Sequence, residues 1–141
     1  MTQMIFINLP VADVRASTAF YEALGATRNE MFSNETTSSM VISDAITVML
    51  LAHERWRDFS SRKIPNAKES AQVLLCLSRD SREACDAAVE AAVAAGGTAD
   101  PTPKQDLGFM YGRSFDDPDG HIWEVVWMDM AAVEASSPTG A

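Results

Sequence analysis

The residue whose type and surroundings most favour chemistry is Glu124, a carboxylate within the apolar segment IWEVVW. Carboxylates are rarely buried among hydrophobic side chains without a partner, so Glu124 is a candidate general base. The two-residue period of a strand puts Ile122, Glu124 and Val126 on one face. Two interpretations stay open. Either Glu124 faces a concave site, or it pairs with an arginine or lies at a solvated sheet edge.

The segment FMYGRSF carries a second group of candidate residues. Its small residues Gly112 and Ser114 share a face that a helix could approach closely. We therefore expect Tyr111 and Arg113 to point the other way, toward the same site as Glu124. There Arg113 could neutralise Glu124 or bind a substrate carboxylate through two N–H groups. The alternative is an exposed arginine at a sheet edge.

The chain offers few histidine or cysteine side chains for metal binding or nucleophilic chemistry. The chain has only two histidines, His53 and His121, and two cysteines, Cys76 and Cys85. These numbers exclude a histidine-rich metal centre, and a Cys/His zinc pattern is absent. We interpret both cysteines as buried, reduced thiols. His121 follows a turn directly and is a weaker candidate base than Glu124, and His53 is expected at the solvated surface.

The strands that must position these residues follow from hydrophobic runs and turn signals. We expect them at 4–11, 26–33, 37–43, 46–52, 72–78, 98–100, 109–115 and 121–127. The run Asp117-Pro-Asp-Gly predicts the turn of the last hairpin. Between the two halves, residues 53–70 break the strand pattern and predict a short helix and a linker.

Two longer helices are expected, each after the first strand of its half. One covers 14–24 and begins after an Asp13 cap. The other covers 81–95 and begins after an Asp80 cap, with Glu83 completing a capping box. Glycines directly after both segments are typical of helix ends.

The order of elements is βαβββ followed by βαβββ, which divides the chain into modules at about 1–52 and 71–128 with a flexible tail at 129–141. Each module is too small to cover both faces of its own sheet. We therefore predict one domain of the α+β class, in which the two modules form a concave mixed sheet with the helices outside.

Composition limits the possible partners. Of 141 residues, 20 are acidic and 11 are basic, and the net charge of −9 disfavours nucleic acids and anionic membranes. No apolar run reaches the length of a transmembrane helix, and the N-terminus lacks the basic start of a signal peptide. The acidic surface and the reduced thiols fit a cytoplasmic protein, which is our expectation.

Two motifs, with the repeat between them, carry a family resemblance. Residues 8–25 contain N-L-P-V-A-D followed by S-x-x-F-Y-x-x-L-G, and residues 117–124 read D-P-D-G-H-x-W-E. Together they resemble the glyoxalase/bleomycin-resistance/dioxygenase group, the vicinal oxygen chelate superfamily, and within it the bacterial predicted lactoylglutathione lyases. The resemblance covers residues 4–128. It implies the glyoxalase/bleomycin-resistance fold, a cup-shaped small-molecule site and a homodimer.

The resemblance also implies a divalent metal in the cup, which would chelate substrate oxygens and stabilise an oxyanion. The four ligand positions of the family fall on Phe6, Met49, Glu124 and either Val73 or, with a one-residue bulge, Gln72. Phe6 and Met49 cannot bind a hard cation. At most Glu124 and Gln72 remain, so no cofactor is firmly predicted. Weak or substrate-dependent binding of a divalent metal stays open.

The expected catalytic residue is thus Glu124. The expected binding residues are Phe6, Asn8, Met49, Trp56, Gln72, Tyr111 and Arg113. Trp56, with Phe59, could close over the cup as a lid or could lie buried under the sheet or in a dimer interface.

Three functions are weighed. The first is a glyoxalase-like lyase or isomerase that uses Glu124 as its base. The second is a metal-independent protein that sequesters a small apolar or antibiotic-like molecule. The third is a structural or partner-binding protein whose cup is filled by side chains. The expected partners are a small-molecule ligand and a second copy of the chain.

Overall fold

The structure is a computed structural model that describes residues 2–136. The first module consists of β1 (Ile5–Val11), α1 (Val14–Ala23), β2 (Thr27–Arg28), the 3-10 helix η1 (Glu30–Phe32), β3 (Thr37–Val41) and β4 (Ile46–Ala52). The second consists of β5 (Leu75–Ser78), α3 (Arg82–Ala94), β6 (Thr98–Ala99), β7 (Gln105–Asp106), β8 (Met110–Asp116) and β9 (Ile122–Met128). The short helix α2 (His53–Trp56) lies between the modules, and α4 (Met130–Ser136) follows the second.

The two sheets have the same strand order, which confirms the predicted repeat. The order is β1-β4-β3-β2 in the first sheet and β5-β9-β8-β6 in the second, and the first strand of each is parallel to its neighbour. Asn8 lies opposite Met49, and Cys76 lies opposite Glu124. Asn8 lies five residues before the helix cap Asp13, and Cys76 lies five residues before the helix cap Ser81, so these two positions are equivalent as well. Met49 and Glu124 therefore occupy equivalent positions, as the sequence indicated.

The helices begin where a side chain can satisfy a free backbone N–H group. The Asp13 carboxylate accepts from Ala16 N at 3.0 Å, as predicted. The second helix is capped by Ser81 and not by Asp80, since the Ser81 hydroxyl accepts from Ala84 N at 3.0 Å. This shift leaves Glu83 one residue short of the position that a capping box requires.

Some boundaries differ from the sequence prediction. The strand expected at 26–33 ends at Arg28, because Asn29 caps η1 by accepting from Met31 N. The strand expected from residue 72 begins at Leu75. The loop after β6 contains the unpredicted strand β7, which pairs with β8. Helix α4 lies within the tail that was expected to be flexible, and residues 137–141 lie outside the described part of the chain.

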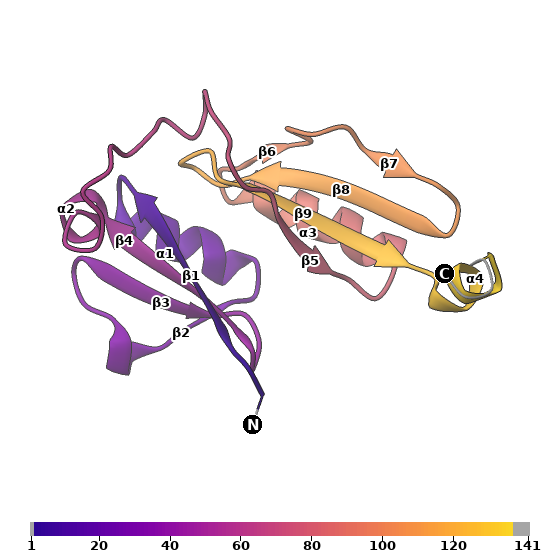
Figure 1. Ribbon diagram of the computed structural model, residues 1–141, viewed down its shortest axis with the longest axis horizontal. Helices are drawn as coiled ribbons and strands as arrows, with labels where there is room; N and C mark the ends of the chain where they lie inside the picture. The colour runs from indigo at the N-terminus through magenta and orange to yellow at the C-terminus, as the bar shows by residue number, and fades with distance from the viewer. Residues whose placement is uncertain (1, 137–141) are drawn as a thin grey trace.

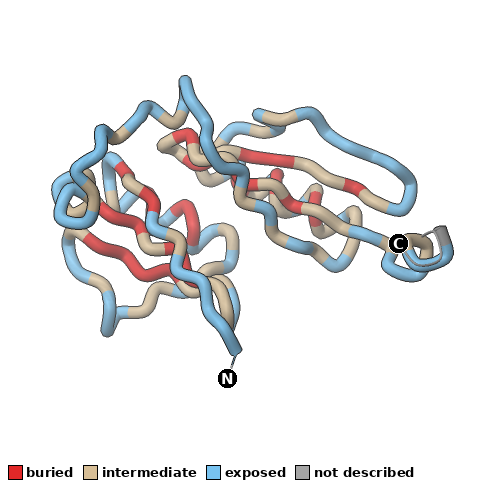
Figure 2. Tube along the Cα trace, viewed as in Figure 1, coloured by how far each residue is buried: buried red, intermediate tan, exposed pale blue. Residues whose placement is uncertain are grey.

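Both long helices lie on the same side of the molecule, behind the two sheets in the view of Figure 1. The core lies between these helices and the sheets, and Figure 2 shows the buried positions concentrated there. Its largest members include Phe20, Met40, Leu50, Phe115 and Trp123. Within residues 2–136, no helix combines the length and the apolar character needed to cross a bilayer. Among the described elements, no long helix lies on the other face of either sheet (Figure 1).

Hydrogen bonds between the modules fix their relative position. The Tyr21 hydroxyl donates to Asp117 Oδ2 at 2.6 Å and accepts from Trp123 Nε1 at 2.9 Å. Asp117 Oδ1 accepts from the backbone N of Asp119 at 3.0 Å and of His121 at 2.9 Å. Burial raises the pKa of Asp117 and that of Tyr21. The aspartate predicted to form only a turn therefore also joins α1 to the β8–β9 hairpin.

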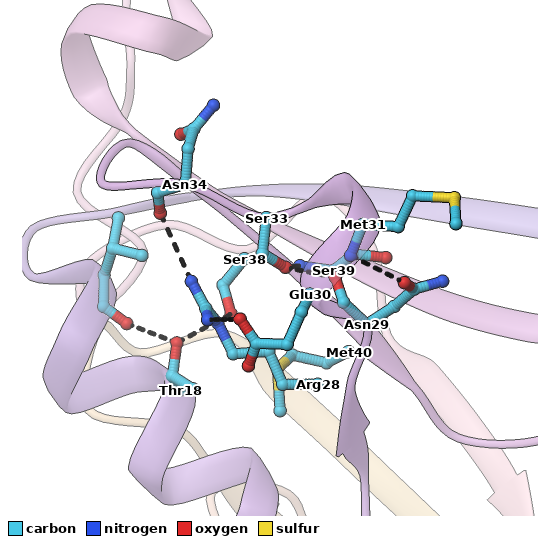
Figure 3. Close-up of polar contacts among 11 residues, drawn as sticks. Thr18, Arg28, Asn29, Glu30, Met31, Ser33, Asn34, Ser38, Ser39 and Met40 are labelled. Carbon is cyan, nitrogen blue, oxygen red and sulfur yellow. Dashed lines mark hydrogen bonds and ion pairs between the residues drawn. The ribbon is translucent and has the colours of Figure 1, made fainter.

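A polar cluster at the outer edge of the first module joins α1 to β2 and β3 (Figure 3). Thr18 Oγ1 lies 2.7 Å from Ser38 Oγ, which also accepts from Arg28 Nε at 3.3 Å. Arg28 forms an ion pair with Glu30 and contacts the Asn34 carbonyl. Because these charged groups have partners within the cluster, we interpret it as structural.

Candidate functional site

A cavity of about 320 Å³ lies where the two modules meet the linker, residues 57–74. In Figure 1 this linker passes over the space between the sheets, from α2 to β5. We call the cavity of about 320 Å³ the junction cavity; it is lined by Asn8, Leu9, Pro10, Trp56, Ser60, Arg62, Lys63, Pro65, Ala67, Ser70, Ala71, Gln72, Val73, Leu75, Gly120, His121 and Ile122. Most of these side chains are apolar. Three predicted binding residues, Asn8, Trp56 and Gln72, meet here.

A second cavity of about 630 Å³ adjoins the first, and the two share Pro10, Ser60, Arg62, Lys63, Pro65, Ala67 and His121. The remaining wall of this second space brings in His53, Arg57 and Asp119. We call it the cationic cavity, after Arg57, Arg62 and Lys63. None of these three residues was predicted to bind a ligand. The linker contributes most of both walls, and hydrophobic periodicity gives no information about the path of such a segment.

Gly120 allows the linker to pack closely against the β8–β9 turn. Its φ of +97° is a conformation that L side chains rarely adopt. A Cβ atom at this position would lie 2.8 Å from Lys68 N and 2.9 Å from Ala67 C. The linker backbone therefore reaches the turn only because residue 120 has no side chain, and this approach closes one wall of the junction cavity.

His121 lies between the two cavities, yet its polar groups are used by the junction of the modules. Its Nε2 is 2.8 Å from the Pro10 carbonyl oxygen, and a carbonyl can only accept, so Nε2–H donates to it. Its backbone N donates to Asp117. These bonds favour a structural role over that of a base. His53, expected at the solvated surface, is half-buried and lines the cationic cavity.

Glu124 lies on the open face of β9, opposite the helices. Trp123 and Val125 are buried, whereas Glu124 is half-buried, which confirms the predicted alternation. Its carboxylate forms no hydrogen bond or ion pair with any residue from 2 to 136. It does not line the junction cavity, but Ile122, two residues earlier on the same face, does. Two residues of strand span roughly 7 Å.

Cys76 is the neighbour of Glu124 across the β5–β9 pair. It is exposed, so the prediction of two buried thiols is right only for Cys85. Partial burial, and then the negative charge of Glu124, raise the pKa of Cys76. A raised pKa keeps the thiol protonated and disfavours a nucleophilic role.

Phe6 and Met49 lie outside the junction cavity. Phe6 is on β1 and is 55% exposed, two residues before Asn8. Met49 pairs with Asn8 from β4 and is half-buried. Both are therefore near the junction cavity in the sheet without forming its wall.

Tyr111 and Arg113 point away from this site, which corrects the sequence prediction. Tyr111 donates to Asp86 Oδ1 in α3 at 2.6 Å. The Arg113 guanidinium pairs with Asp86 at 3.1 Å and with Asp100 at 2.8 Å. The pairing of β8 with β9 explains this, since Arg113 lies opposite the buried Val125 and Gly112 lies opposite Val126. The bulky residues thus face the helix.

We predict that Arg113→Gln lowers the free energy of unfolding by about 1–2 kcal/mol at pH 7, after allowance for solvent screening of partly exposed partners. The hydrogen bond from Tyr111 and then that from Arg113 lower the pKa of Asp86, and the bond from Arg113 lowers that of Asp100. Such groups stabilise the fold fully above their unfolded pKa, and this contribution is lost as pH falls through the folded pKa.

Urea unfolding at several pH values tests this prediction. The difference between wild type and Arg113→Gln should be largest at neutral pH and should shrink below about pH 4. A difference that grows on acidification would contradict the assignment of Asp86 and Asp100 as the partners of Arg113.

The residues at the family's metal positions do not fit a resident divalent ion. Phe6 lies seven residues before the cap Asp13, and Leu74 lies seven residues before the cap Ser81. Leu74 is therefore the equivalent of Phe6, in place of Gln72 or Val73. Glu124 is then the only oxygen donor among four positions that otherwise hold Phe6, Met49 and Leu74. Across residues 2–136, no three His, Cys, Asp or Glu side chains lie together as a metal site would require.

Comparisons with known proteins place the chain among proteins of this fold. The model of the Glyoxalase/Bleomycin resistance protein/Dioxygenase superfamily matches residues 3–125. The hypothetical protein SA1046 from S. aureus is 27% identical, with a TM-score of 0.75 over 90% of this chain and 94% of that one.

Two further solved structures share the fold at lower identity. A glyoxalase/bleomycin resistance protein/dioxygenase family enzyme from Burkholderia phytofirmans PsJN is 22% identical, with a TM-score of 0.72 over 90% of this chain and 99% of that one. The fosfomycin resistance protein FosX from Listeria monocytogenes is 20% identical, with a TM-score of 0.63 over 90% and 91%. The comparison with curated proteins found no match.

Proposed function

The chain belongs to the Glyoxalase/Bleomycin resistance protein/Dioxygenase superfamily, and we propose that it binds a small, largely apolar molecule in the junction cavity. The observation that carries this proposal is the wall of the cavity, where Asn8 and Ile122 from the two modules meet Trp56 and Gln72 from the connecting segment. Small-molecule sites are commonly concave, mostly apolar and supplied with a few polar groups. The amide groups of Asn8 and Gln72 provide such groups here.

Binding of N-phenyl-1-naphthylamine, a neutral apolar fluorophore, tests the proposal. Wild-type protein should enhance its fluorescence saturably. Ala71 lines the junction cavity, so Ala71→Phe should weaken binding at least about tenfold by filling the space. Ala94 is an exposed alanine of α3 outside the cavity, so Ala94→Phe is the matched control and should bind as wild type does. Failure of folded wild-type protein to bind saturably, or equal losses in both variants, would contradict the proposal.

A lyase or isomerase that uses Glu124 as its base is the second candidate function. Its support is the half-buried carboxylate of Glu124, which no described residue pairs with, two residues along β9 from the cavity wall. If this function holds, Glu124→Gln abolishes turnover and leaves the affinity for N-phenyl-1-naphthylamine within about twofold of wild type, because the side chain lies outside the cavity. Loss of probe binding in this variant would instead indicate a direct role in binding.

The homodimer and the cytoplasmic location stay predictions. Apolar side chains exposed on and before the edge strand β1 support pairing with a second copy: Met4, Ile5 and Phe6 are each about half exposed. Such a patch at a sheet edge is typical of an association surface.

A further inference from the structure

We propose that the ligand is an organic anion, and that Arg57, Arg62 and Lys63 bind its charged group in the cationic cavity while its apolar body occupies the junction cavity. This inference rests on the proposed binding function and adds the chemical class of the ligand. It is carried by the distribution of charge along the linker and by the residues that the two cavities share.

Positive charge is concentrated at this site in a chain whose net charge is −9. Residues 55–68 contain five of the 11 lysines and arginines, and the segment has a single acidic residue, Asp58. That carboxylate is already paired with Arg55 at 2.9 Å. The segment has no second acidic residue, although Glu54 and Glu69 flank it.

The three cations also lack partners elsewhere in the described chain. Four arginines, at positions 28, 55, 82 and 113, form ion pairs with carboxylates. No such pair is formed by Arg57, Arg62 or Lys63 with any residue from 2 to 136. The one carboxylate that lines the cationic cavity is Asp119, and its Oδ1 accepts from Ala12 N at 2.8 Å. Arg57, Arg62 and Lys63 are exposed, so their charged groups are accessible to an anionic ligand.

The positions of Arg62 and Lys63 indicate the chemical class of this ligand. Both residues line the junction cavity as well as the cationic cavity, so their side chains border an apolar space and a charged one. A guanidinium binds carboxylate, sulfonate and phosphate oxygens through paired N–H groups. The ligand class is therefore an anionic head joined to an apolar body, and cationic ligands are disfavoured.

Two fluorophores with the same aromatic body distinguish the contribution of the charged head to binding from that of the apolar body. N-Phenyl-1-naphthylamine is neutral, and 1-anilinonaphthalene-8-sulfonate carries one sulfonate on the same framework. The double variant Arg62→Gln/Lys63→Gln should lower the affinity for the sulfonate about tenfold. Its affinity for the neutral probe should stay within about twofold of wild type. Added NaCl should weaken sulfonate binding to wild type and should affect the double variant much less.

The control removes two positive charges elsewhere. Arg15 and Arg79 line neither cavity and form no ion pair with any residue from 2 to 136, and Arg15→Gln/Arg79→Gln has the same net charge as the test variant. It should keep wild-type affinity for both probes. Octanoate and octyl phosphate should each displace the sulfonate probe from wild type at lower concentration than octanol does, and the better of the two identifies the preferred head.

The outcomes separate this inference from the proposed function. If neither probe binds saturably to the folded protein, binding in the junction cavity fails. If the neutral probe binds but the two double variants lose sulfonate affinity equally, or octanol competes as well as the anions, the anionic class is overturned and the binding function stands.

Discussion

Asp117→Ala is expected to lower the free energy of unfolding by about 3 kcal/mol, because it leaves several buried donors without an acceptor. Asp117 is 2% exposed and accepts from the Tyr21 hydroxyl and from two backbone N–H groups of its own turn. These groups lie at the contact between α1 and the β8–β9 hairpin, so their loss weakens the join between the modules. Denaturant unfolding measures the effect.

Two further variants make the result specific. Tyr21→Phe removes one hydroxyl and keeps the ring, so we expect a smaller loss of about 1–2 kcal/mol. Asp80→Ala changes an exposed aspartate that caps no helix in the structure, and it should stay within about 0.5 kcal/mol of wild type. Equal losses for Asp117→Ala and Asp80→Ala would show that the buried network does not hold the modules together.

Gly120→Ala is expected to destabilise the protein by about 2–4 kcal/mol and to weaken binding of N-phenyl-1-naphthylamine. The new methyl group would meet the backbone of Ala67 and Lys68, so the linker must move away from the turn. Because this approach closes the junction cavity, the substitution should affect both stability and binding. Urea unfolding and a fluorescence titration on the same samples measure the two effects.

Gly25 supplies a matched control for backbone strain. Its φ of +99° nearly equals the +97° of Gly120, but a Cβ atom there would meet nothing within 4 Å. Gly25→Ala should therefore cost only the strain of a left-handed alanine, about 1 kcal/mol, and should leave probe binding unchanged. If the two variants behave alike, the close approach of the linker contributes nothing to the cavity.

Much of the fold could be predicted because its signals are local. Apolar runs and turn residues located most of the strands, and the Asp13 cap was placed correctly. The errors occur where neighbouring residues compete for one role. Asp80 and Ser81 could both cap α3, and only the backbone conformation selects the serine. The two-residue β7 depends on its pairing with β8, which no local pattern encodes.

The candidate site was less predictable, because it depends on how distant segments meet. Asn8, Trp56 and Gln72 were among the predicted binding residues, and the structure brings these three to one cavity. The alternation of side chains along β8 could not decide which face of the strand meets α3. The small residues Gly112 and Ser114 suggested that their own face does, which was wrong. The strand register decides the orientation, because Arg113 lies opposite Val125, whose side chain is buried against the helices. The cations of the linker were missed because an irregular segment carries no periodic signal.

The measurement that tests the central claim most directly is a ¹H–¹⁵N spectrum recorded during titration with N-phenyl-1-naphthylamine. The three tryptophans give separate indole signals, and Trp56 alone lines the junction cavity, whereas Trp123 and Trp127 belong to the second module. We predict that the Trp56 indole and the side-chain amides of Asn8 and Gln72 shift saturably, while the Trp127 indole stays in place. Saturable shifts confined to Trp127 and the α3 side of the sheet, with Trp56 unmoved, would contradict the account.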